Sequence, residues 1–220
     1  MNDLLKDFNI ADYNKFDIYY NLLTEKNKVM NLTSITEYED VYIKHFYDSL
    51  LITKCNMKEG SLIDIGSGAG FPGLVLAIQD EDRPITLLEP TGKRARFLEE
   101  VASTLNLPNV KVINDRAENL KATYMYATAR AVAGLNILLE LVIPLLEVGG
   151  YFYCMKGANY EEELLASTNA MQELNISLDA IYHFDLPLDK GKRSILVFKK
   201  LGKTKQVYPR RYAQILKQPL

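Results

Sequence analysis

The chain is poor in cysteine, because only Cys55 and Cys154 occur among its 220 residues. Two isolated thiols are too few for a disulfide framework and lack the spacing of a metal site, so we expect neither. The first ten residues, MNDLLKDFNI, are polar and acidic, without the basic and apolar stretches of a secretory signal. We therefore expect a cytoplasmic protein without a resident metal.

Long uninterrupted hydrophobic runs are also missing. The most apolar segment, 131–155, is broken by Asn136, Glu140, Glu147 and Gly149. This pattern favours a buried helix followed by a buried strand over a membrane span. With 48% hydrophobic and 25% charged residues, the composition is typical of a soluble globular chain with one substantial core.

Acidic residues are absent from the C-terminal end. Residues 190–220 contain ten Lys or Arg and no Asp or Glu, so the other 16 basic and all 28 acidic residues lie in 1–189. A basic end on an acidic body suggests a polyanionic partner, because Lys and Arg gain from phosphate contacts. On charge alone, however, a solvated tail is the simpler explanation.

Hydrophobic periodicity predicts a helical N-terminal extension, residues 1–55, with amphipathic helices over 12–30 and around 41–50. An α/β domain (56–200) and a basic tail packed on or near it (201–220) follow. Helices of about 14 residues are expected between successive strands, including one over 135–147, which indicates a mainly parallel sheet. The last two strands are close enough in sequence for an antiparallel hairpin. The expected strands are 61–65, 84–89, 109–114, 126–130, 150–156, 176–184 and 193–198.

The stretch LIDIGSGAGFPGLVLAI (62–78) places Gly66, Gly68, Gly70 and Gly73 between a predicted strand and a predicted helix. Such a turn brings backbone N–H groups close to a ligand at a helix N-terminus. A dinucleotide site has the same layout, with an acidic residue such as Glu89 ending the next strand to bind ribose hydroxyls. No Gly-Lys-Ser/Thr follows, which disfavours a nucleoside triphosphatase.

Asp64 favours S-adenosylmethionine as the ligand of this loop. It lies two residues before Gly66, at the end of the strand. A carboxylate there would repel a pyrophosphate and attract the ammonium and sulfonium groups of S-adenosylmethionine. The alternative, that Asp64 only caps N–H groups of the loop, is less favoured. We expect Asp64, Ser67 and Glu89 to belong to the cofactor site.

The methyl acceptor is indicated by motifs that are missing. The fourth strand exits as ATARAVAG, without the Asn/Asp-Pro-Pro-aromatic turn of amino-directed base methyltransferases, and neither cysteine lies in a recognisable nucleophile loop. What remains is an acceptor that is already nucleophilic. Guanine N7 is one, because its lone pair carries no proton and the enzyme need only align it with the methyl group.

These residues resemble a known family, the bacterial 16S rRNA guanine-N7 methyltransferases called RsmG, formerly GidB. The resemblance implies a class I, Rossmann-like, S-adenosylmethionine-dependent methyltransferase with a seven-stranded, mainly parallel sheet. It also implies 16S rRNA or the small ribosomal subunit as partner. From the residues themselves we expect no membrane partner, and nothing in them demands more than a monomer. The motifs that carry the resemblance are NLTSI (31–35), HFYDSL (45–50), DIGSGAGFPGLVLAI (64–78), RAE (116–118), ARAVA (129–133), PLLEVGG (144–150) and YPRRYAQILKQPL (208–220).

The resemblance also assigns roles to individual positions. It implies that the cofactor site is lined by Gly66, Phe71, Ala117, Glu118 and Arg130. No general base is expected. Candidates for positioning the substrate, each with an ordinary structural alternative, are Arg130, Lys156, Asn31 and His45.

Some positions depart from the family pattern. Met125 stands where the family usually has an acidic residue, and the segment 118–126 is shorter than usual. Ala213 and Ile215 replace a Gly and a Pro in the tail. Met125 and the shortened segment keep open the alternative of a non-catalytic RNA-binding or ribosome assembly factor. The glycine loop itself keeps open a less favoured alternative, an NAD-dependent oxidoreductase.

Overall fold

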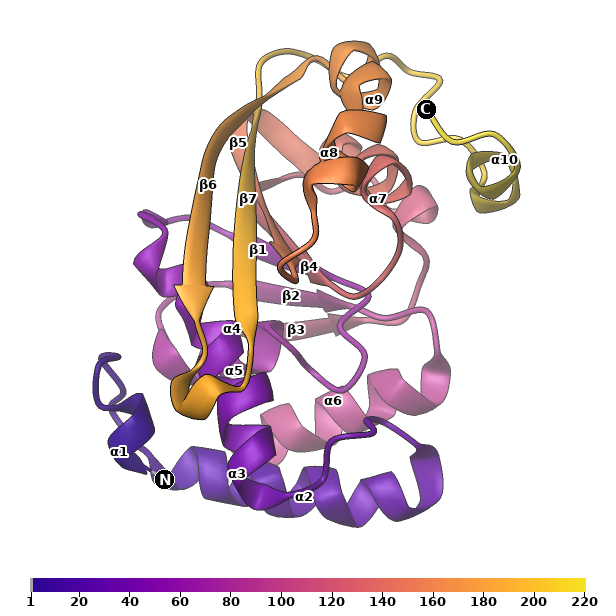
Figure 1. The fold of residues 1–220 in the computed structure, drawn as a ribbon. Coiled ribbons are helices and arrows are strands. Elements are labelled where there is room, and N and C mark those ends of the chain that lie inside the picture. The colour runs from indigo at the N-terminus through magenta and orange to yellow at the C-terminus, as the bar shows by residue number, and fades with distance from the viewer. Residues whose placement is uncertain (1) are drawn as a thin grey trace.

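A computed structural model describes residues 2–220, so the first residue of the predicted extension lies outside the described part. The core is one seven-stranded sheet in the order β3-β2-β1-β4-β5-β7-β6, which Figure 1 shows as a twisted layer between helices. The predicted seven-stranded sheet is confirmed. The strands are β1 (Leu62–Ile65), β2 (Ile85–Leu88), β3 (Val110–Ile113), β4 (Tyr124–Arg130), β5 (Leu146–Lys156), β6 (Ile176–Asp185) and β7 (Lys192–Lys200).

The strand directions place the ligand-binding edge of the sheet. Strands β1 to β5 pair in parallel, whereas β7 runs antiparallel to both β5 and β6, as the predicted hairpin requires. The strand order reverses between β1 and β4. Open α/β sheets bind ligands in the crevice at the carboxyl ends of such neighbouring strands. The loops after β1 and β4 are therefore the first place to look for a site.

The helices are shorter than the sequence pattern suggested. Among the helices between successive strands, only α6, with 13 residues, approaches the predicted length of about 14 residues. The connection from β3 to β4 contains a single 3₁₀ turn, Ala117–Asn119, and no α-helix. The helix predicted over 135–147 ends at Val142, and a 3₁₀ turn containing Pro144 leads into β5. Proline has no N–H to donate to an α-helical ladder, which explains the early end.

The bounds of the helices are α1 (Asn2–Leu5), α2 (Asn14–Met30), α3 (Tyr38–Val41), α4 (Asp48–Leu50), α5 (Gly73–Gln79), α6 (Gly92–Thr104), α7 (Leu135–Val142), α8 (Glu161–Ala166), α9 (Thr168–Glu173) and α10 (Tyr212–Lys217). A π-helical segment, Tyr42–Tyr47, joins α3 to α4, so that 38–50 forms one continuous rod.

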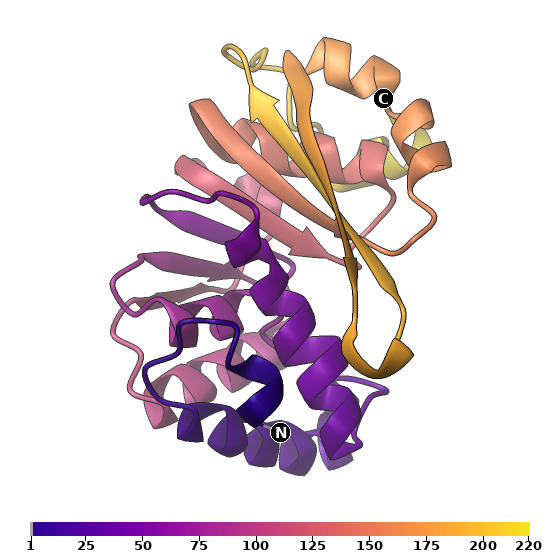
Figure 2. The same cartoon turned by 60° about the vertical axis from the view of Figure 1, so that its left-hand side comes forward.

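Helices α2, α5, α6 and the rod 38–50 cover one face of the sheet (Figure 2). Phe16, Tyr19 and Leu23 of α2 are buried, as the amphipathic pattern predicted. They pack with Phe46 of the rod in a core that continues to strand residues such as Leu87. The tip of the β6–β7 hairpin reaches this rod, where Lys190 forms an ion pair with Asp40 at 2.9 Å. Both the N-terminal helices and the hairpin thus border the loops after β1 and β4.

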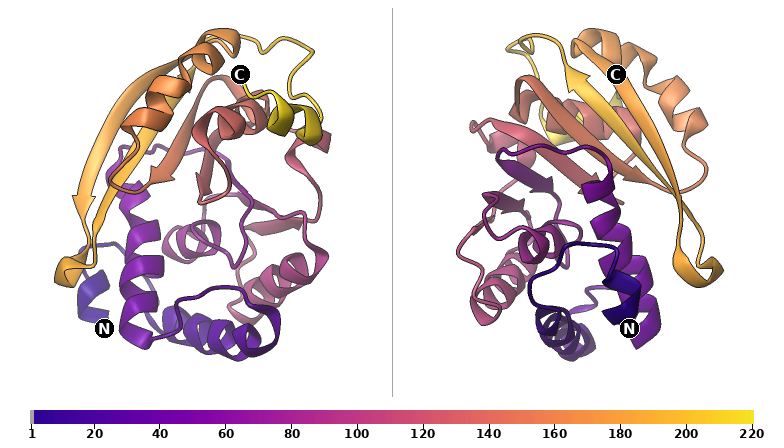
Figure 3. Two further views of the ribbon diagram at one scale, coloured as in Figure 1. Left: turned by 45° about the vertical axis from the view of Figure 1, so that its right-hand side comes forward. Right: turned by 90° about the vertical axis from the view of Figure 1, so that its left-hand side faces the viewer.

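Helices α7 to α10 cover the other face (Figure 3). Leu138 and Leu139 of α7 pack into a second core with Phe152 and Phe198 of the sheet, and Ile215 of α10 is fully buried in it. The C-terminal helix is therefore anchored in the hydrophobic core. Within residues 2–220, no helix has the length and hydrophobicity needed to cross a membrane.

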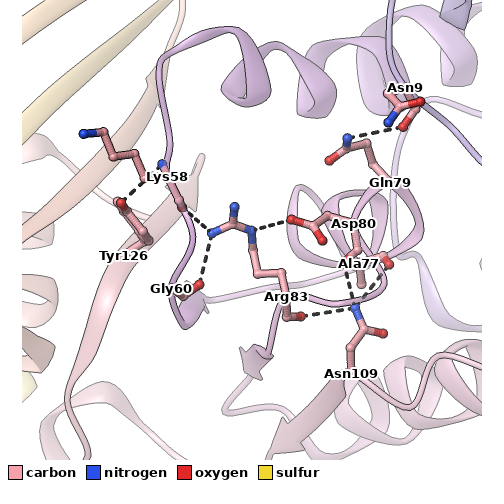
Figure 4. Close-up of polar contacts among 9 residues, drawn as sticks. All are labelled: Asn9, Lys58, Gly60, Ala77, Gln79, Asp80, Arg83, Asn109 and Tyr126. Atoms are coloured by element: carbon pink, nitrogen blue, oxygen red, sulfur yellow. Dashed lines mark hydrogen bonds and ion pairs between the residues drawn. The ribbon is translucent and has the colours of Figure 1, made fainter.

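The amino ends of the strands are tied together away from this edge (Figure 4). Arg83 donates hydrogen bonds to the carbonyl oxygens of Lys58 and Gly60, each at 3.0 Å, and forms an ion pair with Asp80. The side-chain amide of Asn109 donates to carbonyl oxygens of the same turn. These contacts satisfy backbone acceptors where the strands begin. They leave the carboxyl edge as the open end of the sheet.

Candidate functional site

The glycine loop follows β1 directly, as the sequence predicted. Gly66 and Gly68 have φ values of +68° and +60°, a left-handed conformation that glycine adopts without steric cost. A side chain on Gly66 would collide with Val132, whose nearest methyl carbon would lie 2.9 Å from the added Cβ. A Cβ on Gly68 would meet nothing closer than 3.8 Å. The loop therefore has open space beside Gly68, where a ligand can approach its backbone.

The side chain of Asp64 contacts the start of α5, the helix that follows the loop. Its side chain is fully buried, and its Oδ2 accepts a hydrogen bond at 3.0 Å from the backbone N–H of Gly73, at the start of α5. Burial raises the pKa of this carboxyl group to about 7. This contact agrees with the alternative, because the carboxylate caps the N-terminus of the helix after the loop. Its other oxygen, Oδ1, has no hydrogen-bond partner among the described residues, and the predicted contact of Asp64 with a cofactor stays a prediction.

Glu89 performs a similar task from the end of the next strand. Its Oε2 accepts the N–H of Gly68 at 2.9 Å, and its Oε1 accepts the N–H of Thr91 at 2.8 Å. The side chain is buried, and it holds the glycine loop against β2. Ser67 is also buried and donates to the carbonyl oxygen of Asp64 at 3.0 Å. These residues shape the loop, and their predicted contact with a cofactor stays a prediction.

Phe71 is covered by aromatic neighbours from the N-terminal helices. The ring of His45 stacks on it with the centroids 4.4 Å apart, and Tyr19 stacks on it at 5.4 Å. The guanidinium carbon of Arg130 lies 5.1 Å from the same ring. Only 6% of Phe71 is exposed, so the ring mainly packs against His45 and Arg130.

His45 is a neutral histidine with both ring nitrogens engaged. Its Nε2 lies 2.9 Å from the hydroxyl of Thr33, and its Nδ1 lies 3.2 Å from a guanidinium nitrogen of Arg130. Burial, together with the Arg130 charge, lowers the pKa of His45 to about 3. Nδ1 also lies 3.2 Å from the carbonyl oxygen of Lys44, so the ring contacts Arg130 and Lys44 with the same nitrogen. These contacts agree with the structural alternative for His45, a largely buried histidine with satisfied ring nitrogens.

Arg130 ends β4 at the centre of the site. Its guanidinium donates to Oδ2 of Asp48 at 3.0 Å and to the carbonyl oxygen of Lys44 at 3.1 Å. Asp48 also pairs with Arg193 of β7, whose Nε lies 3.1 Å from Oδ1. One buried carboxylate on the rod thus joins two arginines that come from different strands. Such a fixed guanidinium presents its remaining N–H groups in a defined direction.

A cavity of about 640 Å³ opens beside these arginines, and we call it the arginine cavity. It is bordered by the loop Ala131–Gly134 after β4 and by the end of β5. The charged and polar side chains on its wall are Lys44, His45, Asp48, Arg130, Lys156, Glu163 and Arg193. Every carboxylate on this wall is paired with a cation.

Lys156 closes the far side of the arginine cavity. Its ammonium group lies 2.7 Å from Oε2 of Glu163, and that same oxygen accepts the N–H of Leu135 at the start of α7. The Lys156 side chain is only 12% exposed, so it is neither a solvated lysine nor a freely available one. The Lys156–Glu163 pair fixes the loop between β4 and α7, which contains Val132.

A second, smaller pocket lies on the other side of Val132, with a volume of about 190 Å³. It brings together three of the predicted cofactor residues, Gly66, Ala117 and Glu118. The rest of its wall comes from the ends of β1 and β2, from Asp115 and Arg116 after β3, from Val132 and α7, and from Tyr212 at the start of α10. We call it the Tyr212 pocket. The two cavities share Val132, and Gly66 is the glycine of the loop that lines the Tyr212 pocket.

Not every predicted residue reaches these cavities. Asn31 is exposed and ends α2 in a left-handed conformation with φ of +50°, and it lines neither cavity. Its role is that of a helix C-cap. Sequence reasoning also missed Arg193 and Tyr212. Both belong to the basic C-terminal end, where charge was the main signal. Tyr212 lies in the motif YPRRYAQILKQPL, which gave that side chain no role of its own.

Comparison with known proteins identifies the family. Residues 12–194 match the family model described as rRNA small subunit methyltransferase G. The ribosomal RNA small subunit methyltransferase G of Clostridium botulinum (strain 657 / Type Ba4) is 41% identical over 227 residues, covering 100% of this chain and 95% of the relative. The protein of the same name from Staphylococcus carnosus is 40% identical, covering 97% and 94%.

Solved structures share the fold at low sequence identity. The M. jannaschii protein TYW2 in complex with AdoMet aligns with a TM-score of 0.59 and 13% identity, covering 76% of this chain and 80% of that one. An S-adenosylmethionine-dependent O-methyltransferase from Thermotoga maritima aligns with a TM-score of 0.54 and 16% identity, covering 84% and 73%. The predicted class I methyltransferase fold is confirmed. On the full-length matches, the chain belongs to the rRNA small subunit methyltransferase G family.

Proposed function

We propose that the protein transfers a methyl group from S-adenosylmethionine to N7 of a guanine in 16S rRNA. The family relatives are named as methyltransferases of small-subunit ribosomal RNA. The sequence resemblance points more finely to N7 of guanine 527 as the methylated atom. S-adenosylmethionine supplies an electrophilic methyl group. The residues around the two cavities would bind the cofactor and the RNA and align the two reacting atoms.

The cavities fit an elongated cofactor with one apolar and one charged end. The Tyr212 pocket is smaller than the ~300–1,000 Å³ of sites that enclose a whole drug-sized ligand, so it suits one ring system. The loop backbone at Gly68 has open space beside it, and Val132 lies on the wall of both the pocket and the cavity. Arg130 offers a guanidinium, 16% exposed, to the carboxylate of the methionine moiety.

One observation carries the choice of acceptor atom: the described residues on the wall of the arginine cavity offer no free general base. Both nitrogens of His45 are engaged, Asp48 is paired with two arginines, and Glu163 is paired with Lys156. An amino or hydroxyl acceptor would need a group to remove its proton. Guanine N7 attacks with a lone pair and loses no proton. The site therefore suits an acceptor of this type.

The cations around the cavity suit an RNA substrate. Lys44, Arg130 and Arg193 come from the rod, β4 and β7, and their side chains are 16–29% exposed. Phosphates gain from such cations by direct contact and by counterion release. The chain's role is then to bind the RNA, exclude water and hold the lone pair in line with the methyl group.

The test is nucleoside analysis of 16S rRNA from cells that lack the protein. We expect 7-methylguanosine to fall by one residue per 16S rRNA, and to be restored by the wild-type chain. Gly68→Asp should not restore it, because the added carboxylate would fill the open space at the loop. A 7-methylguanosine content equal to that of wild-type cells contradicts the proposal.

The two alternatives left open by the sequence predict different results. A nicotinamide-dependent oxidoreductase would be stabilised against heat by NAD(H) and not by S-adenosylhomocysteine. A non-catalytic assembly factor would give no methyl incorporation into small ribosomal subunits. We expect stabilisation by S-adenosylhomocysteine and measurable incorporation.

A further inference from the structure

The C-terminal segment is built into the wall of the Tyr212 pocket. After β7 ends at Lys200, the chain crosses to the far face of the sheet, where α10 lies beside α7 (Figures 1 and 3). Ile215 of α10 is fully buried in the core of that face. The first residue of this helix, Tyr212, lines the pocket that also contains Gly66 and Ala117. A segment 146 residues from the glycine loop in sequence thus completes the same pocket.

An ion pair holds the segment in place just before Tyr212. Nε of Arg210 donates to Oε1 of Glu140 at 2.8 Å, and the backbone N–H of Arg210 donates to the same oxygen at 3.0 Å. A second guanidinium nitrogen donates to Oε2, which makes the pair bidentate. Glu140, on α7, is fully buried. A bidentate pair of this kind fixes the direction of the chain as well as its position.

The chemistry of the Tyr212 pocket matches a flat aromatic base. Its wall is mostly apolar and includes Leu88, Ala117, Val132 and Leu141 together with the tyrosine. Three charged residues, Asp115, Arg116 and Glu118, also line it. The Tyr212 ring has the guanidinium carbon of Arg116 5.9 Å from its centroid, so its position is restrained from a second side. An aromatic wall with apolar neighbours favours a stacked base over a sugar or a carboxylate.

From this geometry we propose that Tyr212 is a cofactor-binding residue that forms the outer wall of the adenine site, and that Arg210 positions it. The inference rests on the proposed use of S-adenosylmethionine, and it assigns to the tail a role beyond RNA binding. Arg210 acts through Glu140 and does not itself contact the cofactor.

The test is the dissociation constant of S-adenosylhomocysteine, measured by calorimetry on the full chain. Tyr212→Ala should weaken binding by roughly tenfold or more, because an aromatic stacking partner contributes about 1–3 kcal/mol per base and each 1.4 kcal/mol is tenfold. Tyr212→Phe keeps the ring and should bind as the wild type does. Leu216→Ala, at an exposed position of the same helix, is the matched control and should also bind normally.

Arg210→Lys tests the positioning role. It keeps a cation beside Glu140 and removes the two-pronged geometry. We expect it to weaken binding in the wild-type background and to have no further effect in the Tyr212→Ala background. Equal effects in both backgrounds would contradict a role exerted through Tyr212.

The outcomes separate this inference from the proposed function. If Tyr212→Ala binds S-adenosylhomocysteine within threefold of the wild type while Gly68→Asp does not bind it, the cofactor site stands and the role of Tyr212 is refuted. If the wild-type chain does not bind S-adenosylhomocysteine, both proposals fail. Thermal unfolding of each variant, compared with Leu216→Ala, shows whether a loss of binding comes from loss of the fold.

Discussion

Asp64 and Glu89 show how two buried carboxylates fix the backbone of the glycine loop. Asp64 accepts the N–H of Gly73, the first residue of α5, and Glu89 accepts the N–H of Gly68 in the loop. Each oxygen that accepts such an N–H satisfies a donor that the tight turn would otherwise leave unpaired. The acids therefore fix the backbone, and the backbone forms the binding surface.

The stability of the fold should depend on the ionisation of Asp64. Its pKa of about 7 in the native state lies above the usual 3.8, so between these values the native state binds more protons than the unfolded state. Stability from this group is complete below about pH 4 and is lost as the pH rises through 7. Relative to Asp64→Asn, the wild type should lose on the order of 1 kcal/mol of unfolding free energy per pH unit between pH 5 and 7. Urea unfolding at each pH measures the difference, and parallel pH profiles for the two proteins would refute it.

Asp48 should matter for catalysis more than for folding. Its carboxylate holds Arg130 and Arg193 at 3.0 and 3.1 Å. Asp48→Asn loosens both arginines, and a loss of about 1–3 kcal/mol in their placement corresponds to a roughly ten- to hundredfold lower rate of methyl transfer. The matched control is Glu173→Gln, which removes an ion pair with Lys205 outside the cavity. An Asp48→Asn rate equal to that of the control would show that the arginines are placed by other contacts.

Individual residues also mark the limit of what the sequence could predict. The glycines and Arg130 were found because they sit next to strand ends, where a local pattern is enough. For Asp64 the sequence left two roles, because a carboxylate at a strand end can contact a ligand or cap the helix that follows, and only the structure shows the hydrogen bond to Gly73. Arg193 and Tyr212 were missed because their neighbours are 145 and 146 residues away, at Asp48 and Gly66. Only the folded chain brings those pairs together.

At the level of elements, the ion pair between Glu140 and Arg210 joins α7 to the segment just before α10. Most elements were predictable from periodicity, because their buried faces repeat every two residues or about every 3.6 residues. The missing helix between β3 and β4 and the early end of α7 were not. The connection from Ile113 to Tyr124 is too short for a helix of about 14 residues, and Pro144 ends the helical pattern of α7.

Removing Arg210 should strongly destabilise the chain. Arg210→Ala leaves the carboxylate of Glu140 fully buried without its partner, and breaking such a pair costs about 3–5 kcal/mol. Arg211→Ala, next in sequence and exposed, should change the unfolding free energy by less than about 0.5 kcal/mol. Urea unfolding compares the two variants. Equal stabilities would mean that Glu140 is reached by water or neutralised in another way.

At the scale of the whole molecule, the basic C-terminal end is less available than its composition suggests. Lys200 is buried and donates to the carbonyl oxygens of Ile143 and Leu146. Four more of its ten cations form ion pairs within the chain, namely Lys190, Arg193, Lys205 and Arg210. Half of the basic residues thus stabilise the fold or the site. The other five, of which Arg211 is one, remain for an external polyanion.

Arg211 should contribute to RNA binding through its charge. Each phosphate contact steepens the salt dependence of binding, so Arg211→Gln should reduce the slope of log affinity against log salt by roughly 1. Lys28→Gln, an exposed charge on α2 at the opposite face, is the control and should leave the slope unchanged. The measurement is a salt titration of binding to 16S rRNA fragments. An unchanged slope for Arg211→Gln would remove the C-terminal helix from the RNA surface.

The most direct test of the account is to incubate the purified protein with methyl-labelled S-adenosylmethionine and small ribosomal subunits from cells lacking it. The 16S rRNA is then digested to nucleosides, and the label is located. We predict that all of the incorporated label is found in 7-methylguanosine. Label in any other nucleoside, or none in the rRNA, would contradict methyl transfer to guanine N7. It would also contradict the inference that the arginine cavity, which offers no free general base, selects an acceptor without a proton to lose.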